Sequence, residues 1–168
     1  MKVEIVHVQV TEKSVLQNLI ELYEYDFSEF NDADVNMYGL YGYKYFDYYW
    51  TEDTRFPFFI KVGGIYAGFV LINEYCYILK DPGSKTIAEF FIMKKYRRKG
   101  IGRNVAFQIF NKFPGQWEVL QHGENEPSKL FWSKVISEYT NNNYRQEKAK
   151  TELWEGQALI FNNSQNCN

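Results

Sequence analysis

The sequence predicts a single α/β domain in which helices flank a mixed central sheet of about six to seven strands. Patterns typical of strands and helices follow one another in the order strand, helix, three strands, helix, strand, helix, two strands. The strand, helix and strand over 86–121 form a crossover unit, which a parallel pair of strands requires. At 168 residues the chain is long enough for one domain with a sizeable core.

The N-terminal part begins with a strand and a helix. Residues 3–10 alternate and are β-branched, which predicts a strand. Thr11 is a suitable N-cap, and apolar residues at helical spacing continue to about Tyr25 or Phe27. From 31 to 54 the pattern is lost among Asp, Asn, Gly and Tyr, so we expect a short helix and loop over a pocket.

The middle and C-terminal parts contain the remaining strands. Gly63-Gly64 between two β-rich runs predicts a hairpin. Pro114-Gly115 should end the second helix. We expect strands over 56–62, 65–73, 86–93, 117–121, 144–148 and 157–161, a turn over 81–84, and helices over 102–113 and 127–139. The domain should therefore span 1–161, followed by a polar C-terminal tail over 162–168.

Composition and charge exclude several classes of protein. The formal net charge is −2 and the sequence pI is about 5.8, which argues against binding nucleic acid or an anionic membrane through the overall field. No run reaches the roughly 18 apolar residues of a membrane span, and we expect no signal peptide. Cys76 and Cys167 lie far apart, so we expect no structural disulfide and a cytoplasmic location. His7 and His122 have no partner pattern, so no metal site is predicted.

The most informative stretch is the loop over 94–103, KKYRRKGIGR. Six of its ten residues are basic, although the chain as a whole is acidic. The loop joins a buried strand to a helix and contains Gly100 and Gly102. A helix N-terminus exposes unpaired N–H groups and the positive end of its dipole, and glycines let an anion approach the backbone closely. The loop is therefore a candidate phosphate site.

Two other phosphate-binding motifs do not fit this loop. The dinucleotide-binding fingerprint needs a third glycine, but Val105 stands there. The nucleoside-triphosphate loop needs Gly-Lys-Ser/Thr, but Gly102 is followed by Arg103-Asn104. A solvated basic turn stays open as the alternative.

The pattern Arg97-x-x-Gly100-x-Gly102, after an apolar strand and before a helix, resembles the acetyl-CoA signature of the GNAT N-acetyltransferases, Gln/Arg-x-x-Gly-x-Gly/Ala. A second stretch, NEPSKLFW over 125–132, resembles the family's Asn-x-x-Ala-x-x-Phe-Tyr pattern. The resemblance covers roughly 3–161 and implies a GNAT-like fold with acetyl-CoA as the cofactor. It implies that the coenzyme contacts backbone amides of the strand over 90–93, the loop with the start of its helix, and the second stretch. The expected residues are Phe91, Ile92, Met93, Arg97, Arg98, Lys99, Gly100, Ile101, Gly102, Arg103, Asn125 and Phe131.

One position departs from the family pattern. Trp132 stands where Tyr is common and serves in many relatives as the acid that protonates the departing thiolate. An indole N–H does not titrate usefully. An ordinary thiol titrates around 8.5, so the coenzyme thiolate can leave without a dedicated acid. The general acid therefore stays unassigned.

Glu89 is the candidate general base. It is a charged residue within the apolar run over 87–92, on the strand expected to line the reaction centre. Burial among rings raises the pKa of a carboxylate, which suits proton removal. The resemblance agrees, because a Glu on this strand does that work in many relatives. Alternation does not settle which face Glu89 takes, so a solvent-facing or ion-paired Glu stays open.

The acceptor is expected to be an amine of a small molecule or peptide, acetylated by direct transfer in a ternary complex. Tyr23 and Asp26, with the Tyr-rich segment that follows, lie where relatives bind the acceptor, and acid with rings suits a cationic amine. The alternative is a solvated helix face with core tyrosines. The alternative function is a non-catalytic coenzyme-A-binding sensor or interaction module, which Trp132 favours. Edge strands near the C-terminus allow a homodimer.

Overall fold

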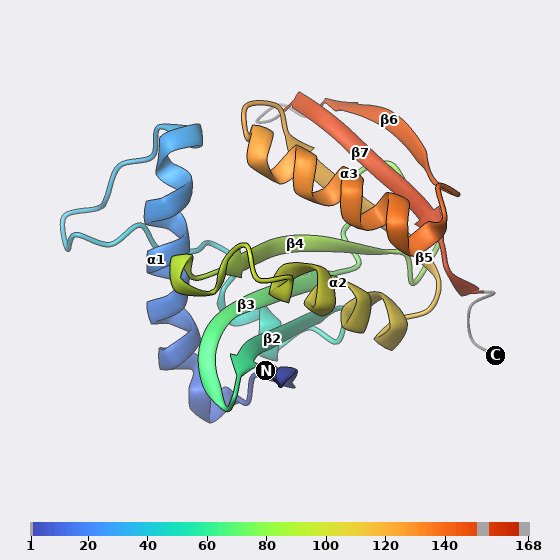
Figure 1. Ribbon diagram of the computed structural model, residues 1–168. Coiled ribbons are helices and arrows are strands. Elements are labelled where there is room, and N and C mark those ends of the chain that lie inside the picture. The colour runs from blue at the N-terminus through green and yellow to red at the C-terminus, as the bar shows by residue number, and fades with distance from the viewer. Residues whose placement is uncertain (1, 151–154, 165–168) are drawn as a thin grey trace.

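The computed structural model of the protein describes residues 2–150 and 155–164, and these form one seven-stranded sheet flanked by helices (Figure 1). The strand order is β1-β2-β3-β4-β5-β7-β6, and only the β4–β5 pair among them is parallel. The strands are β1 (Val3–His7), β2 (Arg55–Val62), β3 (Ile65–Asn73), β4 (Lys85–Ile92), β5 (Gln116–His122), β6 (Arg145–Lys150) and β7 (Glu155–Asn162). The helices are α1 (Lys13–Asn31), α2 (Ile101–Lys112) and α3 (Glu126–Thr140), with 3₁₀ turns η1 (Val10–Glu12), η2 (Asp47–Trp50) and η3 (Lys94–Tyr96).

The predicted fold class, element order and parallel crossover are confirmed, with differences at element ends. β1 ends at His7, before the expected Val10, because its pairing with β2 ends where His7 meets Phe58. α1 continues to Asn31, one turn beyond the expected end. Stacking of Phe27 on Tyr23 and its contact with Phe30 extend the aromatic face through that last turn.

The expected polar tail over 162–168 begins too early. Asn162 is the last residue of β7, and Asn163 is buried. The side chain of Asn163 donates to the Phe110 carbonyl at 2.8 Å and accepts from the Gly115 N–H at 2.7 Å, so it belongs to the domain. Residues 165–168, and with them the question of a Cys76–Cys167 bond, lie outside the described residues.

Two apolar layers cover the two faces of the sheet, because side chains along a strand alternate. On β3, Phe69 and Leu71 face α1, whereas Val70 and Ile72 face α2 and α3. The α1 layer contains Leu16, Leu19, Ile20 and Phe59, and the α2/α3 layer contains Val105, Ile109, Phe110, Val135 and Ile136. None of the helices described is both long and apolar enough to cross a membrane.

The sheet divides at its one parallel junction. β4 and β5 pair only at Lys85–Trp117 and Thr86–Glu118, and beyond Thr86 the two strands separate. In Figure 1 the β1–β4 part of the sheet diverges from the β5–β7–β6 part, and α3 lies over β5 and β7. The edge of β4 that would otherwise pair with β5 is thereby opened.

β6 forms one free edge of the sheet and has the sequence RQEKAK. Charged side chains on an edge strand discourage pairing with another strand. A homodimer through this edge would bring these charges together, and it stays a prediction.

Candidate active site

The separation of β4 from β5 opens a cleft of about 1300 Å³. Most of the site residues expected from the sequence line it, although they come from four separate elements. They are Tyr23, Asp26, Glu89, Phe91, Ile92, Arg97, Arg98, Gly100, Gly102, Arg103, Asn125 and Phe131. Three do not: Met93, the exposed Lys99, and Ile101, which is buried in the α2/α3 layer.

The backbone of β4 presents amides to the cleft at alternate residues. The Met93 N–H donates to the Ala67 carbonyl at 2.9 Å, and Phe91 lies opposite Phe69 of β3. Because backbone groups alternate in direction along a strand, the N–H groups of Phe90 and Ile92 face the opened edge. Of the amides expected from the strand over 90–93, those of Phe90 and Ile92 therefore face the opened edge, whereas those of Phe91 and Met93 point towards β3.

The first turn of α2 faces the same cleft. Gly100 precedes the helix with a φ of +74°, a left-handed conformation that glycine adopts without strain, and no side chain caps the helix. The first N–H groups of a 12-residue helix are thus left to an external acceptor. Phosphate groups suit this position because the helix dipole is positive there.

Gly102 has a different task from Gly100. A Cβ at Gly102 would lie 3.0 Å from Cε2 and 3.1 Å from Cζ of Phe131. The missing side chain therefore lets the Phe131 ring of α3 pack against the first turn of α2. Sequence reasoning assigned both glycines to anion approach, and the structure separates their roles.

Three of the six basic side chains of the loop are paired with acids. Arg97 bonds to Asp26 of α1, and its Nε–H donates to the Ile92 carbonyl at 2.7 Å. Lys94 lies 3.4 Å from the other Asp26 oxygen. Arg103 donates to Glu138 of α3 at 2.8 and 2.5 Å. Asp26 joins α1 to the loop and also lines the cleft, and its expected contact with the acceptor stays a prediction.

Glu89 lies on the α1 side of the cleft, where a bulge in the β3–β4 register places it. Leu71 pairs with Glu89 but Ile72 pairs with Ile87, so Ala88 has no partner in β3. The extra residue puts Ile87 in the α2/α3 layer and leaves Glu89 on the same face as Phe91. The open question of which face Glu89 takes is thereby answered.

Two tyrosine hydroxyls hold the Glu89 carboxylate. Tyr23 donates to one oxygen at 2.5 Å and Tyr43 to the other at 3.0 Å. Burial raises the pKa of Glu89 to about 7, although both hydrogen bonds favour the ionised form. Burial and then the Glu89 charge raise the pKa values of Tyr23 and Tyr43, so these phenols stay protonated donors. The group is a carboxylate able to exchange a proton near neutral pH.

The remaining expected residues belong to α3. The side chain of Asn125 caps this helix by accepting the Ser128 N–H at 3.0 Å. The Phe131 and Trp132 rings both contact Phe90, with centroids 5.7 and 5.0 Å away. Trp132 is buried in the α2/α3 layer and packs in the core. This agrees with the inability of an indole N–H to act as an acid.

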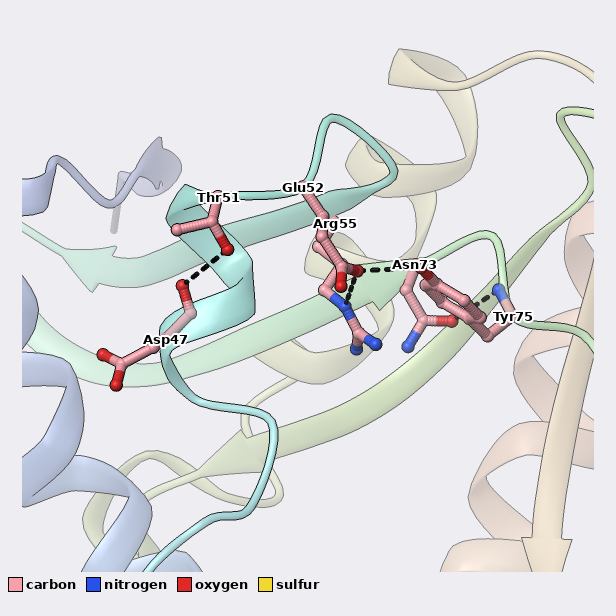
Figure 2. Close-up of polar contacts among 6 residues, drawn as sticks. All are labelled: Asp47, Thr51, Glu52, Arg55, Asn73 and Tyr75. Carbon is pink, nitrogen blue, oxygen red and sulfur yellow. Dashed lines mark hydrogen bonds and ion pairs between the residues drawn. The ribbon is translucent and has the colours of Figure 1, made fainter.

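Several lining residues were missed by sequence reasoning or noted only as part of a Tyr-rich segment. Glu21 accepts the N–H groups of Tyr41 and Gly42 at 2.8 Å each, which brings Tyr43 over Glu89. Arg55, Asn73, Tyr75 and His122 also line the cleft. Figure 2 shows Arg55 and Tyr75 converging on Glu52, at 2.6 and 2.8 Å. Glu52 and Arg55 are only three residues apart, but no local pattern indicates the contact of Tyr75 or the position of these residues at the cleft.

Comparisons with known proteins agree with this geometry. A family model described as the acetyltransferase (GNAT) family matches residues 17–134. No curated protein matches the chain. An acetyltransferase from Thermus thermophilus has a similar solved structure, with a TM-score of 0.70 and 11% identity over 96% of this chain and 97% of that one.

Two further solved structures are similar. One is a spermidine N-acetyltransferase from Vibrio cholerae in complex with CoA and spermine, with a TM-score of 0.63 and 12% identity over 99% of this chain and 98% of that one. The other is an aminoglycoside acetyltransferase in complex with coenzyme A and kanamycin, with a TM-score of 0.67 and 11% identity over 96% of this chain and 95% of that one. At these identities the likeness concerns the fold.

Proposed function

The chain belongs to the GNAT acetyltransferase family, and on this basis we propose that it transfers the acetyl group of acetyl-CoA directly to an amine of a small molecule or peptide in a ternary complex. The observation that carries the proposal is the position of Glu89. Its carboxylate lines the cleft between the separated strands and is held by Tyr23 and Tyr43 at 2.5 and 3.0 Å. The uncapped N-terminus of α2 opens onto the same cleft.

The residues present fit coenzyme A. The first N–H groups of α2 suit its pyrophosphate, with Arg98 and Gly100 lining the approach. The N–H groups of Phe90 and Ile92 suit the thioester and pantetheine, and Phe131 offers an apolar wall. When bound, acetyl-CoA supplies the activated acetyl group as a thioester. Two of the solved neighbours contain coenzyme A, which supports this assignment.

Glu89 accepts the proton that the amine must lose as it forms an amide. With a pKa of about 7, the side chain is ionised above neutral pH and can take that proton directly or through water. Tyr23 and Tyr43 fix the orientation of the carboxylate, since each donates to a different oxygen. No acid is required for the coenzyme thiolate, because an ordinary thiol titrates around 8.5.

The experiment is a thiol-release assay with acetyl-CoA and a panel of amines, on the wild type and Glu89→Gln. We expect turnover to rise with pH through about 7, and the variant to lose that rise together with roughly 10²–10⁴-fold of the rate. Coenzyme binding should stay unchanged.

Glu118→Gln is the matched control, because Glu118 is a buried carboxylate that accepts three backbone N–H groups at 2.8, 2.8 and 2.9 Å. It should lower stability and leave the pH dependence in place. Tight coenzyme binding without turnover on any amine would contradict the proposal and favour a non-catalytic coenzyme-A-binding module. We also propose a cytoplasmic location, which suits a chain whose two cysteines lie far apart in the sequence.

A further inference from the structure

A row of polar side chains crosses the α1 face of the sheet where β4 and β5 still pair. Arg55 of β2 lies opposite Asn73 of β3, and Asn73 lies opposite Thr86 of β4. Residues opposite one another on neighbouring strands share a face, and the neighbour of Asn73, Ile72, faces α2 and α3. All three side chains therefore lie on the α1 side, and all three residues line the cleft. We call Arg55, Asn73 and Thr86 the polar row.

Arg55 is a buried cation with unused donors. Its side chain is 8% exposed, and its Nε–H donates to Glu52 at 2.6 Å. The two Nη atoms carry four further N–H groups, of which one meets the buried Tyr49 hydroxyl and the rest are left to other acceptors. In Figure 2 these nitrogens point away from Glu52, in the same direction as the amide nitrogen of Asn73.

The rings around Arg55 form a cation site that is already filled. Its guanidinium carbon lies 4.4–5.5 Å from the centroids of four rings, those of Tyr45, Tyr48, Tyr49 and Tyr75. The amine of an acceptor therefore cannot use this aromatic cage. The end of the cleft at Arg55 instead offers the N–H donors of a guanidinium whose charge is paired with Glu52.

The polar row also contains a buried hydroxyl without a partner. Within residues 2–150 and 155–164, Thr86 Oγ1 is buried and forms no hydrogen bond. Asn73 accepts the Tyr75 N–H at 2.9 Å through Oδ1, and its amide nitrogen has two N–H groups, of which one meets the Tyr49 hydroxyl and the other is left as a donor. A guanidinium fork, an amide N–H and a hydroxyl are donors that together match the oxygens of a carboxylate.

A wall of tyrosines connects the polar row to Glu89. Tyr43, which donates to Glu89, contacts Tyr45 with ring centroids 6.4 Å apart, and Tyr45 packs on Arg55 at 5.3 Å. Along β4, Glu89 is three residues from Thr86, or about 10 Å of strand. One small molecule can thus place an amine at Glu89 and a second group at the polar row.

We propose that the polar row is a carboxylate-binding subsite, and that the acceptor is a small amine of the amino-acid type that also carries a carboxylate. The Glu52 carboxylate beside the guanidinium favours a monoanion over a doubly charged phosphate, which it would repel. The carboxylate would hold the acceptor so that its amine meets Glu89. This inference rests on the proposed acetyl transfer.

The test uses the standard amino acids, each paired with its carboxamide, as acceptors in the thiol-release assay. We expect kcat/KM for the preferred acid to exceed that of its amide by about tenfold or more. Arg55→Lys, which keeps the charge but loses the fork, should bring this ratio towards one through KM, with coenzyme affinity unchanged. Arg145→Lys, on the exposed edge strand β6, is the matched control and should leave the ratio as it is.

Thr86→Val provides a second variant that changes little volume, in case Arg55→Lys does not fold. A binding measurement separates the two proposals: N-acetylated amino acids and their carboxamides are titrated into the protein saturated with coenzyme A. If the acids bind and the carboxamides do not, and if the variants lose this binding, the carboxylate subsite is supported even when no amine is turned over. Four results would overturn the carboxylate subsite. They are turnover only of amines without a carboxylate, equal use of acids and amides, an unchanged ratio of kcat/KM in Arg55→Lys and Thr86→Val, and neither turnover nor binding.

Discussion

The two sides of the cleft present different kinds of chemical groups, backbone N–H groups on one side and side chains on the other. On the side of α2 and α3, the groups that face a coenzyme are mostly backbone N–H groups, at the start of α2 and along β4. On the α1 side, the groups proposed to face the acceptor are side chains, with Glu89, Tyr43 and Arg55 among them. A common coenzyme needs only a fixed backbone, whereas acceptor chemistry depends on side chains that a family can exchange. The predictions below test that division.

The largest effect should follow from a change to the backbone on the coenzyme side. Gly100→Val places a branched side chain at a φ of +74°, where only glycine is unstrained. The turn must shift, and the first N–H groups of α2 then no longer point at the pyrophosphate. Because a hydrogen bond to a charged group contributes roughly 1.5–3 kcal/mol, losing two should weaken coenzyme binding by about 100-fold or more. Calorimetric titration with coenzyme A measures this.

Gly83→Val is the matched control for Gly100→Val. Gly83 has a φ of +81° and, like Gly100, has nothing within 4 Å of the added Cβ. Both variants should lose similar stability, but only Gly100→Val should lose coenzyme affinity. Equal affinities of the two variants for coenzyme A would contradict the proposal that the loop binds the phosphates.

The coenzyme side could be predicted from sequence because its signals are local. Gly100, Gly102 and the basic run lie within ten residues, between a strand and a helix that each have a clear period. Even here the details depend on tertiary packing. The task of Gly102 became visible only with Phe131 beside it, and the free amides of β4 only with the pairing of Met93 to Ala67.

The acceptor side resisted prediction because its contacts are long-range. Tyr23 is 66 residues from Glu89, and Tyr43 is 46 residues away. The face of Glu89 depends on the bulge at Ala88, and no residue type in an apolar strand announces a bulge. The segment from 32 to 54 has no sequence period, and long-range hydrogen bonds hold it, such as the two that Glu21 accepts from Tyr41 and Gly42.

A buried carboxylate on the acceptor side should cost stability at high pH. Burial raises the pKa of Glu89 from 4.5 in an unfolded chain to about 7. For such a group the contribution to stability is fully present below pH 4.5 and is lost as the pH rises through 7. Glu89→Gln, which does not titrate, should therefore gain about 1–3 kcal/mol over the wild type between pH 5 and pH 8. Urea unfolding at the two pH values measures the difference.

Other titrating groups do not disturb this comparison. Burial and then Glu21 also raise the pKa of Glu24 to about 7; the burial of Glu24 is common to both proteins, and its charge is one cause of the raised pKa of Glu89. Glu29→Gln removes an exposed carboxylate from the same helix and should show no such pH-dependent gain. A constant difference between pH 5 and pH 8 would mean that Glu89 is not buried as a charge.

The smallest effect separates the two tyrosines that hold Glu89. Each hydrogen bond favours the ionised carboxylate, and that of Tyr23 lowers the pKa of Glu89 more than that of Tyr43. Tyr23→Phe should therefore move the rise of kcat/KM with pH upward, on the order of half a pH unit or more, and Tyr43→Phe should move it less. Tyr66→Phe, a hydroxyl removed outside the cleft, should not move it. A purely structural tyrosine would lower the rate at every pH without moving the pH profile of kcat/KM. An unmoved profile in both variants would therefore contradict the role of Glu89 as the general base.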